Sequence, residues 1–204
     1  MPHRLPALAL TAILASTGTP SLTQDAGGFV VRGMGSLGCE QLVSALQSEQ
    51  SDDAAARLVA WLSGYVSHAN RADAEINDVL PYANLNGLGT VVARLCAGNR
   101  DAQVEAVTAS ALATLAPLAV SAPEEAVELR RAEAAVRMRP SVLQGVQERL
   151  ITRELLPEES ADGVYGEQTA KALARFQEDT GLEPTGLPDA WTVFVLQVSQ
   201  PSVQ

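Results

Sequence analysis

The fold of the C-terminal quarter is decided by the stretch Asp162-Gly163-Val164-Tyr165-Gly166-Glu167-Gln168-Thr169, which continues into Ala172-Leu173 and Phe176-Gln177. The Asp-Gly pair predicts a tight turn, and Gly166 permits a second reversal of the backbone. Thr169 then lies in the first turn of a helix whose inward face carries Ala170, Leu173 and Phe176. Gly181 is well placed to end that helix. The stretch therefore predicts a turn followed by an amphipathic helix.

The same pattern recurs closer to the C-terminus, as Thr185-Gly186-Leu187-Pro188-Asp189-Ala190-Trp191-Thr192. Its Gly186, Asp189, Thr192 and Leu196 align with Gly163, Gly166, Thr169 and Leu173 at a constant offset (186 − 163 = 23 positions). A further helical face precedes both units and carries Val142, Leu143, Val146, Leu150 and Ile151. Two turn-helix units and this preceding helix predict a compact three-helix domain over residues 140–198.

These residues resemble the peptidoglycan-binding domain family of bacterial wall hydrolases and wall-associated proteins. The shared pattern is D-G-x-[FY]-G-x-x-T-x-x-A-[VL]-x-x-F-Q, then G-L and T-G-x-x-D-x-x-T-x-x-x-L, and every position is matched between Asp162 and Leu196. The resemblance covers just over a quarter of the chain and implies a three-helix fold that binds peptidoglycan. Before the motif, Glu154-Leu155-Leu156-Pro157 replaces the Gly-aromatic turn of many family members, so we expect a differently shaped loop there.

The residues of the motif divide into two groups. The first group is expected to be structural and to form the backbone turns, the helix starts and the core. Its members are Gly163, Gly166, Thr169, Phe176, Gly186, Asp189 and Thr192. We expect polar or aromatic groups for a sugar or peptide ligand to come from Asp162, Tyr165, Arg175, Gln177 and Trp191. Two alternatives stay open, because Asp162 also suits the turn itself and the helical spacing also permits a core position for Trp191.

The start of the chain has the layout of a signal peptide. Met1-Pro2-His3-Arg4 is basic, and an apolar run over residues 5–15 follows it. We expect a signal peptide over residues 1–24, cleaved between Ala15 and Ala26, and a flexible Gly-rich lead-in over residues 25–38. The run is too short to span a bilayer, so we expect no membrane anchor and place the protein in the periplasm or at the cell wall.

Residues 39–118 carry four amphipathic patterns and predict a helical domain. The inward faces comprise Cys39, Leu42, Val43 and Leu46, then Leu58, Leu62, Tyr65 and Val66, then Leu88, Val91, Val92 and Leu95, and then Val104, Val107, Leu112 and Leu115. Cys39 and Cys96 lie on the first and third of these faces. In an oxidising compartment they predict a disulfide, worth about 3–4 kcal/mol through the entropy of the unfolded chain.

Ser121-Ala122-Pro123-Glu124 has the form of a capping box and introduces a charged, Ala-rich segment. It predicts a linker helix over residues 119–139, and residues 199–204 form a short tail. The predicted fold class is therefore all-α, with a disulfide-linked helical bundle joined to the three-helix domain. The bundle, with its Trp61-x-x-Gly64-Tyr65 cluster, also bears a weak resemblance to small disulfide-linked helical periplasmic proteins such as acid-stress chaperones and immunity proteins.

Composition excludes several classes of function. A net charge of −10 argues against nucleic acid and anionic lipid as partners. His68 is the single histidine beyond the predicted signal peptide, which is too few for a zinc peptidase or amidase, and paired cysteines leave no thiol for a transpeptidase. We expect no catalytic residue, metal or cofactor, although two carboxylates of a glycosidase stay compatible with the many Asp and Glu residues.

Three functions follow in order of preference. The first is a non-catalytic exported protein that binds peptidoglycan and presents residues 39–118 to a periplasmic protein partner. The second is a periplasmic chaperone, inhibitor or immunity protein whose C-terminal domain is only a scaffold. The third is an accessory or catalytic cell-wall hydrolase.

Overall fold

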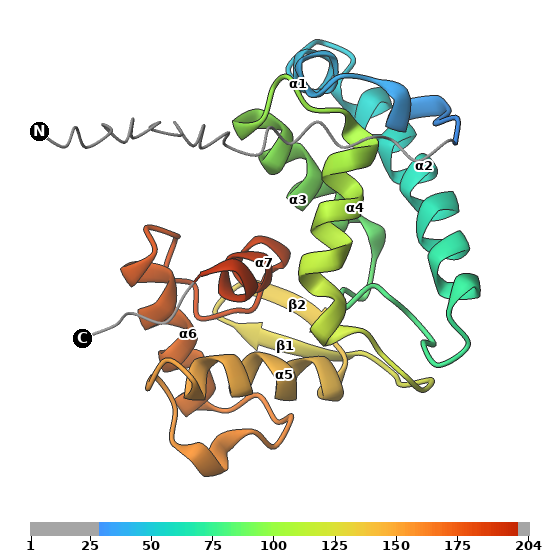
Figure 1. Cartoon of the computed structure of the whole chain (residues 1–204). Coiled ribbons are helices and arrows are strands. Elements are labelled where there is room, and N and C mark those ends of the chain that lie inside the picture. Colours follow the sequence, from blue (N-terminus) through green and yellow to red (C-terminus); the bar gives the residue numbers. More distant parts are fainter. Residues whose placement is uncertain (1–28, 200–204) are drawn as a thin grey trace, which may run out of the picture. The chain divides into compact units, whose positions relative to one another are not determined.

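The computed structural model describes residues 29–199 (Figure 1). The predicted signal peptide, the first part of the lead-in and most of the tail lie outside these residues. All described residues from Val31 onward belong to one compact unit. No helix in the described range is long and apolar enough to cross a membrane.

The first half of the chain contains the four predicted helices. After the 3-10 turn η1 (Gly33–Ser36), they are α1 (Cys39–Leu46), α2 (Ser51–Ala72), α3 (Leu85–Gly98) and α4 (Val104–Leu115), and the short η2 (Ala116–Leu118) follows. Their buried positions include Leu42, Leu62, Val92 and Leu115, as the apolar spacing requires. The prediction of four helices in residues 39–118 is therefore confirmed.

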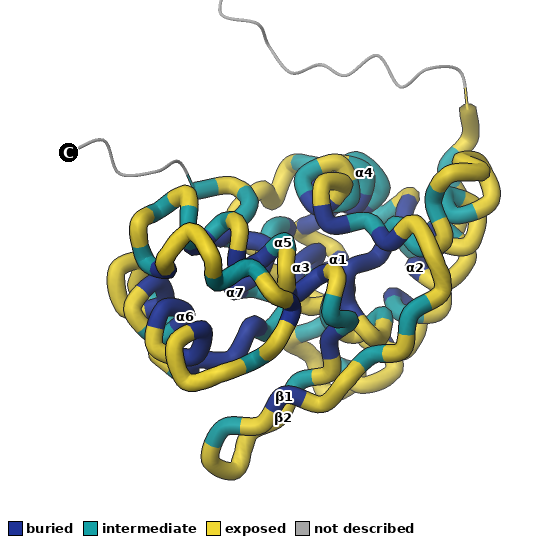
Figure 2. The backbone as a smooth tube through the Cα atoms, turned by 90° about the horizontal axis from the view of Figure 1, so that it is seen from below, coloured by how far each residue is buried: buried dark blue, intermediate teal, exposed yellow. Residues whose placement is uncertain are grey.

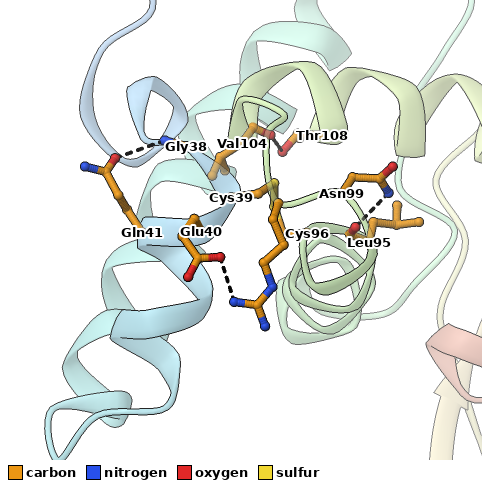
Figure 3. Close-up of a disulfide and its surroundings, with 10 residues drawn as sticks. Gly38, Cys39, Glu40, Gln41, Leu95, Cys96, Asn99, Val104 and Thr108 are labelled. Carbon is orange, nitrogen blue, oxygen red and sulfur yellow. Dashed lines mark hydrogen bonds and ion pairs between the residues drawn. A yellow bond between two sulfur atoms is a disulfide. The ribbon is translucent and has the colours of Figure 1, made fainter.

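A disulfide joins Cys39 at the start of α1 to Cys96 near the end of α3, with the two Cα atoms 4.8 Å apart (Figure 3). Both cysteines are fully buried. The backbone N–H of Cys39 also donates to the carbonyl of Ala102 at 2.8 Å, so the loop before α4 fixes the same end of α1. The predicted disulfide is confirmed.

The predicted linker helix is wrong, because its residues form a β-hairpin. β1 (Val127–Arg131) pairs antiparallel with β2 (Ala134–Met138), so the all-α prediction holds only roughly. Leu129 and Met138 are buried on the inner face of the hairpin, and their burial outweighs the helical propensity of an Ala- and Glu-rich segment. Tyr82 forms a further bridge with Met138 and ties the hairpin to the loop before α3.

Glu124 caps the start of a later helix and does not begin a helix in residues 121–124. Its carboxylate accepts a hydrogen bond from the backbone N–H of Ser141 at 3.1 Å and one from the Ser141 hydroxyl. Ser141 lies in the first turn of α5 (Pro140–Ile151), where N–H groups lack partners within the helix. The Ser-x-x-Glu pattern at residues 121–124 therefore contributes a cap to α5 instead of starting a helix.

The C-terminal part has the predicted three helices. α5 is followed by the 3-10 turn η3 (Glu158–Ser160), by α6 (Glu167–Asp179) and by α7 (Ala190–Val198). Their inward side chains include Leu143, Leu173, Phe176 and Leu196. The three predicted helices are therefore confirmed.

The helical half of the chain (α1 to α4) and the three-helix domain (α5 to α7) pack directly on each other. The Tyr82 hydroxyl donates to the carbonyl of Ala190 at 3.0 Å, and the Arg94 guanidinium lies 5.2 Å from the centre of the Trp191 ring. An ion pair joins Arg139, just before α5, to Asp78 at 2.8 Å. Figure 2 shows buried positions in both parts, and nearly all buried apolar residues from α1 to α7 belong to one cluster.

Candidate functional site

The turn between α5 and α6 is fixed by a buried glutamine, Gln147. Its amide nitrogen donates to Asp162 Oδ1 at 3.0 Å, to the carbonyl of Val164 at 3.1 Å and to the Thr169 hydroxyl at 3.1 Å. Its amide oxygen accepts from the backbone N–H of Gly163 at 2.8 Å. One side chain on α5 therefore holds both sides of the turn and the first turn of α6.

Gln177 on α6 makes the corresponding contacts with the turn before α7. Its amide nitrogen donates to the carbonyl of Leu187 at 2.9 Å and to the hydroxyls of Thr185 and Thr192 at 3.1 and 3.0 Å. Its amide oxygen accepts from the N–H of Gly186 at 2.8 Å. Gln177 is fully buried, so our expectation that it faces a ligand is wrong.

Gly163 and Gly186 have equivalent backbone conformations in the two turns. Each has a φ of 71°, in the region that glycine adopts most readily. A Cβ atom on Gly163 would lie 2.8 Å from the carbonyl oxygen of Pro140, and one on Gly186 would lie 2.8 Å from that of Ala170. Each glycine therefore permits the helix before the turn to approach the turn closely.

A groove runs between the hairpin and the first of these turns. One wall is formed by four consecutive residues of β1, Val127 to Arg130, and the other by Pro140 and residues 162–165. Its volume is about 530 Å³. Val127 on one wall and Val164 on the other are exposed apolar residues, at 44% and 63% exposure.

Asp162 brings a negative charge to the groove. Its Oδ1 accepts from the N–H of Val164 at 2.9 Å and from Gln147. These hydrogen bonds, that from Val164 first, lower the pKa of the Asp162 carboxyl, so it is ionised at neutral pH. Both of these groups donate to Oδ1, no group in residues 29–199 donates a hydrogen bond to Oδ2, and the residue is exposed.

Tyr165 lines the groove and connects the two turns of the three-helix domain. It is half-buried, and its hydroxyl donates to the carbonyl of Gly186 at 2.7 Å, which links the first turn to the second. Burial raises the pKa of the Tyr165 hydroxyl. Beside it, Arg131 of β1 forms an ion pair with Glu167 of α6 at 3.0 Å. This ion pair therefore attaches the hairpin to the three-helix domain.

The structure does not gather the five candidate ligand residues in one place. Asp162 and Tyr165 line the groove, whereas Gln177 is internal and Arg175 is exposed on α6 outside the groove lining. Trp191 is half-buried, stacks on Phe194 with 5.5 Å between ring centres, and contacts Arg94 of α3. Trp191 thus lies where the helical half meets the domain.

The residues expected to be structural lie in the turns and the core. Thr169, Phe176 and Thr192 are buried. Gly166 precedes α6, and Asp189 caps α7 by accepting from the N–H groups of Trp191 and Thr192 at 3.0 and 3.1 Å. Sequence reasoning missed Gln147, although the pair Val146-Gln147 corresponds to Phe176-Gln177.

The comparisons with known proteins identify the domain that contains these turns. Residues 141–196 match the family described as "Putative peptidoglycan binding domain". The match spans α5, α6 and most of α7, so it indicates peptidoglycan binding for this part of the chain. The hairpin and the helical half lie outside the matched residues. Comparisons with curated proteins and with solved structures found no match.

A cell-wall enzyme of the kinds considered above would need a free thiol, a metal site or a pair of carboxylates. Both cysteines are in the disulfide, and no three His, Cys, Asp or Glu side chains in residues 29–199 lie close enough together to hold a metal ion. In the groove, Glu128 is ion-paired with Arg130 at 2.5 Å, and the Asp162 carboxyl has a lowered pKa. A glycosidase needs a carboxylic acid that stays protonated, and the lowered pKa of the Asp162 carboxyl does not suit that role.

Proposed function

We propose that this protein is a non-catalytic, exported peptidoglycan-binding protein that presents its disulfide-linked helical half to a protein partner in the periplasm or at the cell wall. The match of residues 141–196 to the peptidoglycan binding domain family carries the proposal. The groove between the hairpin and residues 162–165 of that domain is the site that we assign to the ligand.

The absence of catalysis is supported by the chemistry of the groove. The Glu128 carboxylate forms an ion pair with Arg130, and hydrogen bonds lower the pKa of the Asp162 carboxyl. A general acid needs a carboxyl that stays protonated, so Asp162 does not suit that role. Binding without bond cleavage is the activity that this set of side chains favours.

Presentation of the helical half is supported by its attachment to the wall-binding domain. Tyr82, Arg94 and Arg139 each join the two parts, so the helical half would be held in a fixed orientation when the domain binds. The buried disulfide favours an oxidising compartment outside the cytoplasm. A periplasmic chaperone, inhibitor or immunity protein would occupy the same compartment. These alternatives differ from the proposal because they do not require binding to the cell wall.

Co-sedimentation with purified peptidoglycan sacculi tests the proposal. We expect the chain without residues 1–24 to sediment with sacculi, and Val164→Lys to reduce the bound fraction because it replaces apolar surface of the groove with a long, positively charged side chain. Val198→Lys is the matched control, since Val198 is also exposed, at 47%, and does not line the groove. Equal, background-level sedimentation of all three proteins would reject peptidoglycan binding and favour the scaffold alternative.

A second measurement tests the non-catalytic assignment. Sacculi incubated with the protein should release no soluble fragments above a buffer blank. If the unmodified protein released fragments and the Asp162→Asn or Glu128→Gln variant did not, the protein would instead be a hydrolase.

A further inference from the structure

β1 turns its edge, and not one of its faces, toward the groove. Side chains of consecutive strand residues point to opposite faces, yet all four residues from Val127 to Arg130 line the groove. Among the described residues β1 pairs only with β2, and the isolated bridges involve other residues. The side of β1 that faces the groove is therefore an open strand edge.

The register identifies the backbone groups on this edge. Arg131 and Ala134 are paired across a two-residue loop, and hydrogen-bonded and non-hydrogen-bonded pairs alternate from there. The pairs Arg130–Ala135 and Glu128–Arg137 are then the non-hydrogen-bonded ones. The N–H and C=O groups of Glu128 and Arg130 consequently point away from β2, toward the groove.

The other features of the groove suit a peptide better than a sugar. Val127 and Val164 offer exposed apolar surface for small side chains, and Asp162 Oδ2 offers a negative acceptor. Sugars are commonly bound by the exposed face of an aromatic ring together with polar groups. Tyr165 is the aromatic residue of the groove lining, and it is half-buried with its hydroxyl bonded to Gly186.

We propose that the groove binds the peptide part of peptidoglycan, whose amide groups hydrogen-bond to the open edge of β1. Peptidoglycan peptides contain alanine and a diamino acid, and a diamino acid that is not cross-linked carries a free ammonium group. The alanine methyl groups would contact Val127 and Val164, and the free ammonium group would pair with Asp162. This assignment rests on the proposed function and deepens it, because the hairpin outside the matched family domain then supplies half of the binding site.

The ligand side is tested with three preparations of sacculi and the full chain without residues 1–24. They are intact sacculi, sacculi whose peptides have been removed from the glycan by an amidase, and intact sacculi whose free amines have been acetylated. We expect the protein to bind intact sacculi and to show only background binding to peptide-free sacculi. Binding to acetylated sacculi should be about tenfold weaker than to intact ones, because acetylation removes one charge-assisted hydrogen bond.

The outcomes separate the two proposals. If intact sacculi are not bound, the proposed function fails. If intact and peptide-free sacculi are bound equally, the proposed function holds and the peptide assignment is overturned in favour of the glycan. If acetylation has no effect, the role of Asp162 in pairing with the amine is overturned.

The protein side is tested with variants of the hairpin and of Asp162. Arg130→Pro removes the N–H group that faces the groove, and a proline at such an edge position leaves the β1–β2 hydrogen bonds intact. Ala135→Pro, at the paired position of β2, removes an N–H group on the opposite edge and is the matched control. Arg130→Ala separates the loss of the side chain from the loss of the N–H group.

We expect Arg130→Pro to weaken binding to intact sacculi about tenfold relative to Arg130→Ala, and Ala135→Pro to bind as the unmodified chain does. Asp162→Asn keeps the oxygen that Gln147 and Val164 contact, and it should bind free and acetylated sacculi equally. Thermal unfolding of each variant establishes that it is folded. Unchanged binding by folded Arg130→Pro would overturn the role of the strand edge.

Discussion

Gln147 and Gln177 occupy equivalent positions in two successive helices, and each holds the turn that follows through contacts with a glycine N–H, a carbonyl and a threonine hydroxyl. Both are buried, so water cannot replace these contacts when the side chain is removed. The two glutamines therefore specify the turns of the domain.

Replacing either glutamine should destabilise the protein strongly. Gln147→Leu leaves the N–H of Gly163 and the carbonyl of Val164 without partners, and we expect the free energy of unfolding to fall by about 3 kcal/mol. Gln177→Leu should have a similar effect through Gly186 and Leu187. Urea denaturation measures the change, and Gln144→Leu, at an exposed position of the same helix α5, is the control. A loss below about 1 kcal/mol in both variants would contradict the assigned role.

Alanine at the two turn glycines should also be costly. In Gly163→Ala and Gly186→Ala, a positive φ and a backbone oxygen 2.8 Å from the new Cβ both oppose the native conformation. We expect each to lower the free energy of unfolding by about 2 kcal/mol or more. Gly64→Ala is the contrasting case, since Gly64 lies within α2 with no atom within 4 Å of the new Cβ. It should raise the stability by about 0.5–1 kcal/mol, as measured by the same denaturation experiment.

Removing the disulfide should destabilise the whole unit. The double substitution Cys39→Ala with Cys96→Ala opens a loop with a sequence separation of 57, and we expect a loss of about 3–4 kcal/mol. Urea denaturation of this variant with and without reductant measures the effect. Reductant should lower the urea midpoint of the unmodified chain and leave that of the variant unchanged. Equal midpoints for the unmodified chain and the variant without reductant would contradict a stabilising role for the disulfide.

All three tyrosines should ionise above the ordinary range for this side chain. Burial is the first cause of the raised pKa of Tyr65, Tyr82 and Tyr165, and for Tyr65 the value is about 12. The folded state therefore favours the protonated hydroxyl of Tyr65 more than the unfolded state does. The stability that the folded protein loses when this hydroxyl ionises is fully present below pH 10, and it disappears as the pH rises from 10 through about 12. A titration of tyrosinate absorbance should show little ionisation near pH 10 in the folded protein and normal ionisation in urea. A tyrosine that titrates near pH 10 in the folded protein would contradict this.

Tyr82→Phe tests the contact between the helical half and the three-helix domain. The substitution removes the hydroxyl that donates to the carbonyl of Ala190 and keeps the ring. We expect a loss of about 1 kcal/mol in a single unfolding transition, because both parts share one buried cluster. Tryptophan fluorescence and circular dichroism should report the same midpoint, and two separate transitions would show that the parts unfold independently.

Local patterns were sufficient to predict most of the helices and the disulfide. In the first half, the apolar residues at Leu58, Leu62 and Val66 recur at the helical period, and burial in α2 follows that period. In the last third, Gly163 and Gly186 mark turns that few other residues could form. These features depend on neighbours in the sequence, so the sequence reveals them.

Features that depend on distant contacts were mispredicted or missed. The hairpin depends on Leu129 and Met138 packing into a core built by other segments, whereas its composition is that of a helix. Gln177 was assigned to the surface because a polar residue is usually exposed, and its partners in the following turn are what permit its burial. The groove depends on β1 lying beside residues 162–165, which no local pattern encodes.

Helix α6 is shared by two successive helix-turn-helix units, because it follows α5 and the first turn and precedes the second turn and α7. Its Thr169 is held by Gln147 behind it, and its Gln177 holds the turn ahead of it. A shared central helix means that neither unit can be excised, duplicated or exchanged between proteins as an independent module. Insertions that enlarge the protein are therefore expected before α5, where the hairpin already lies, and not inside the repeat.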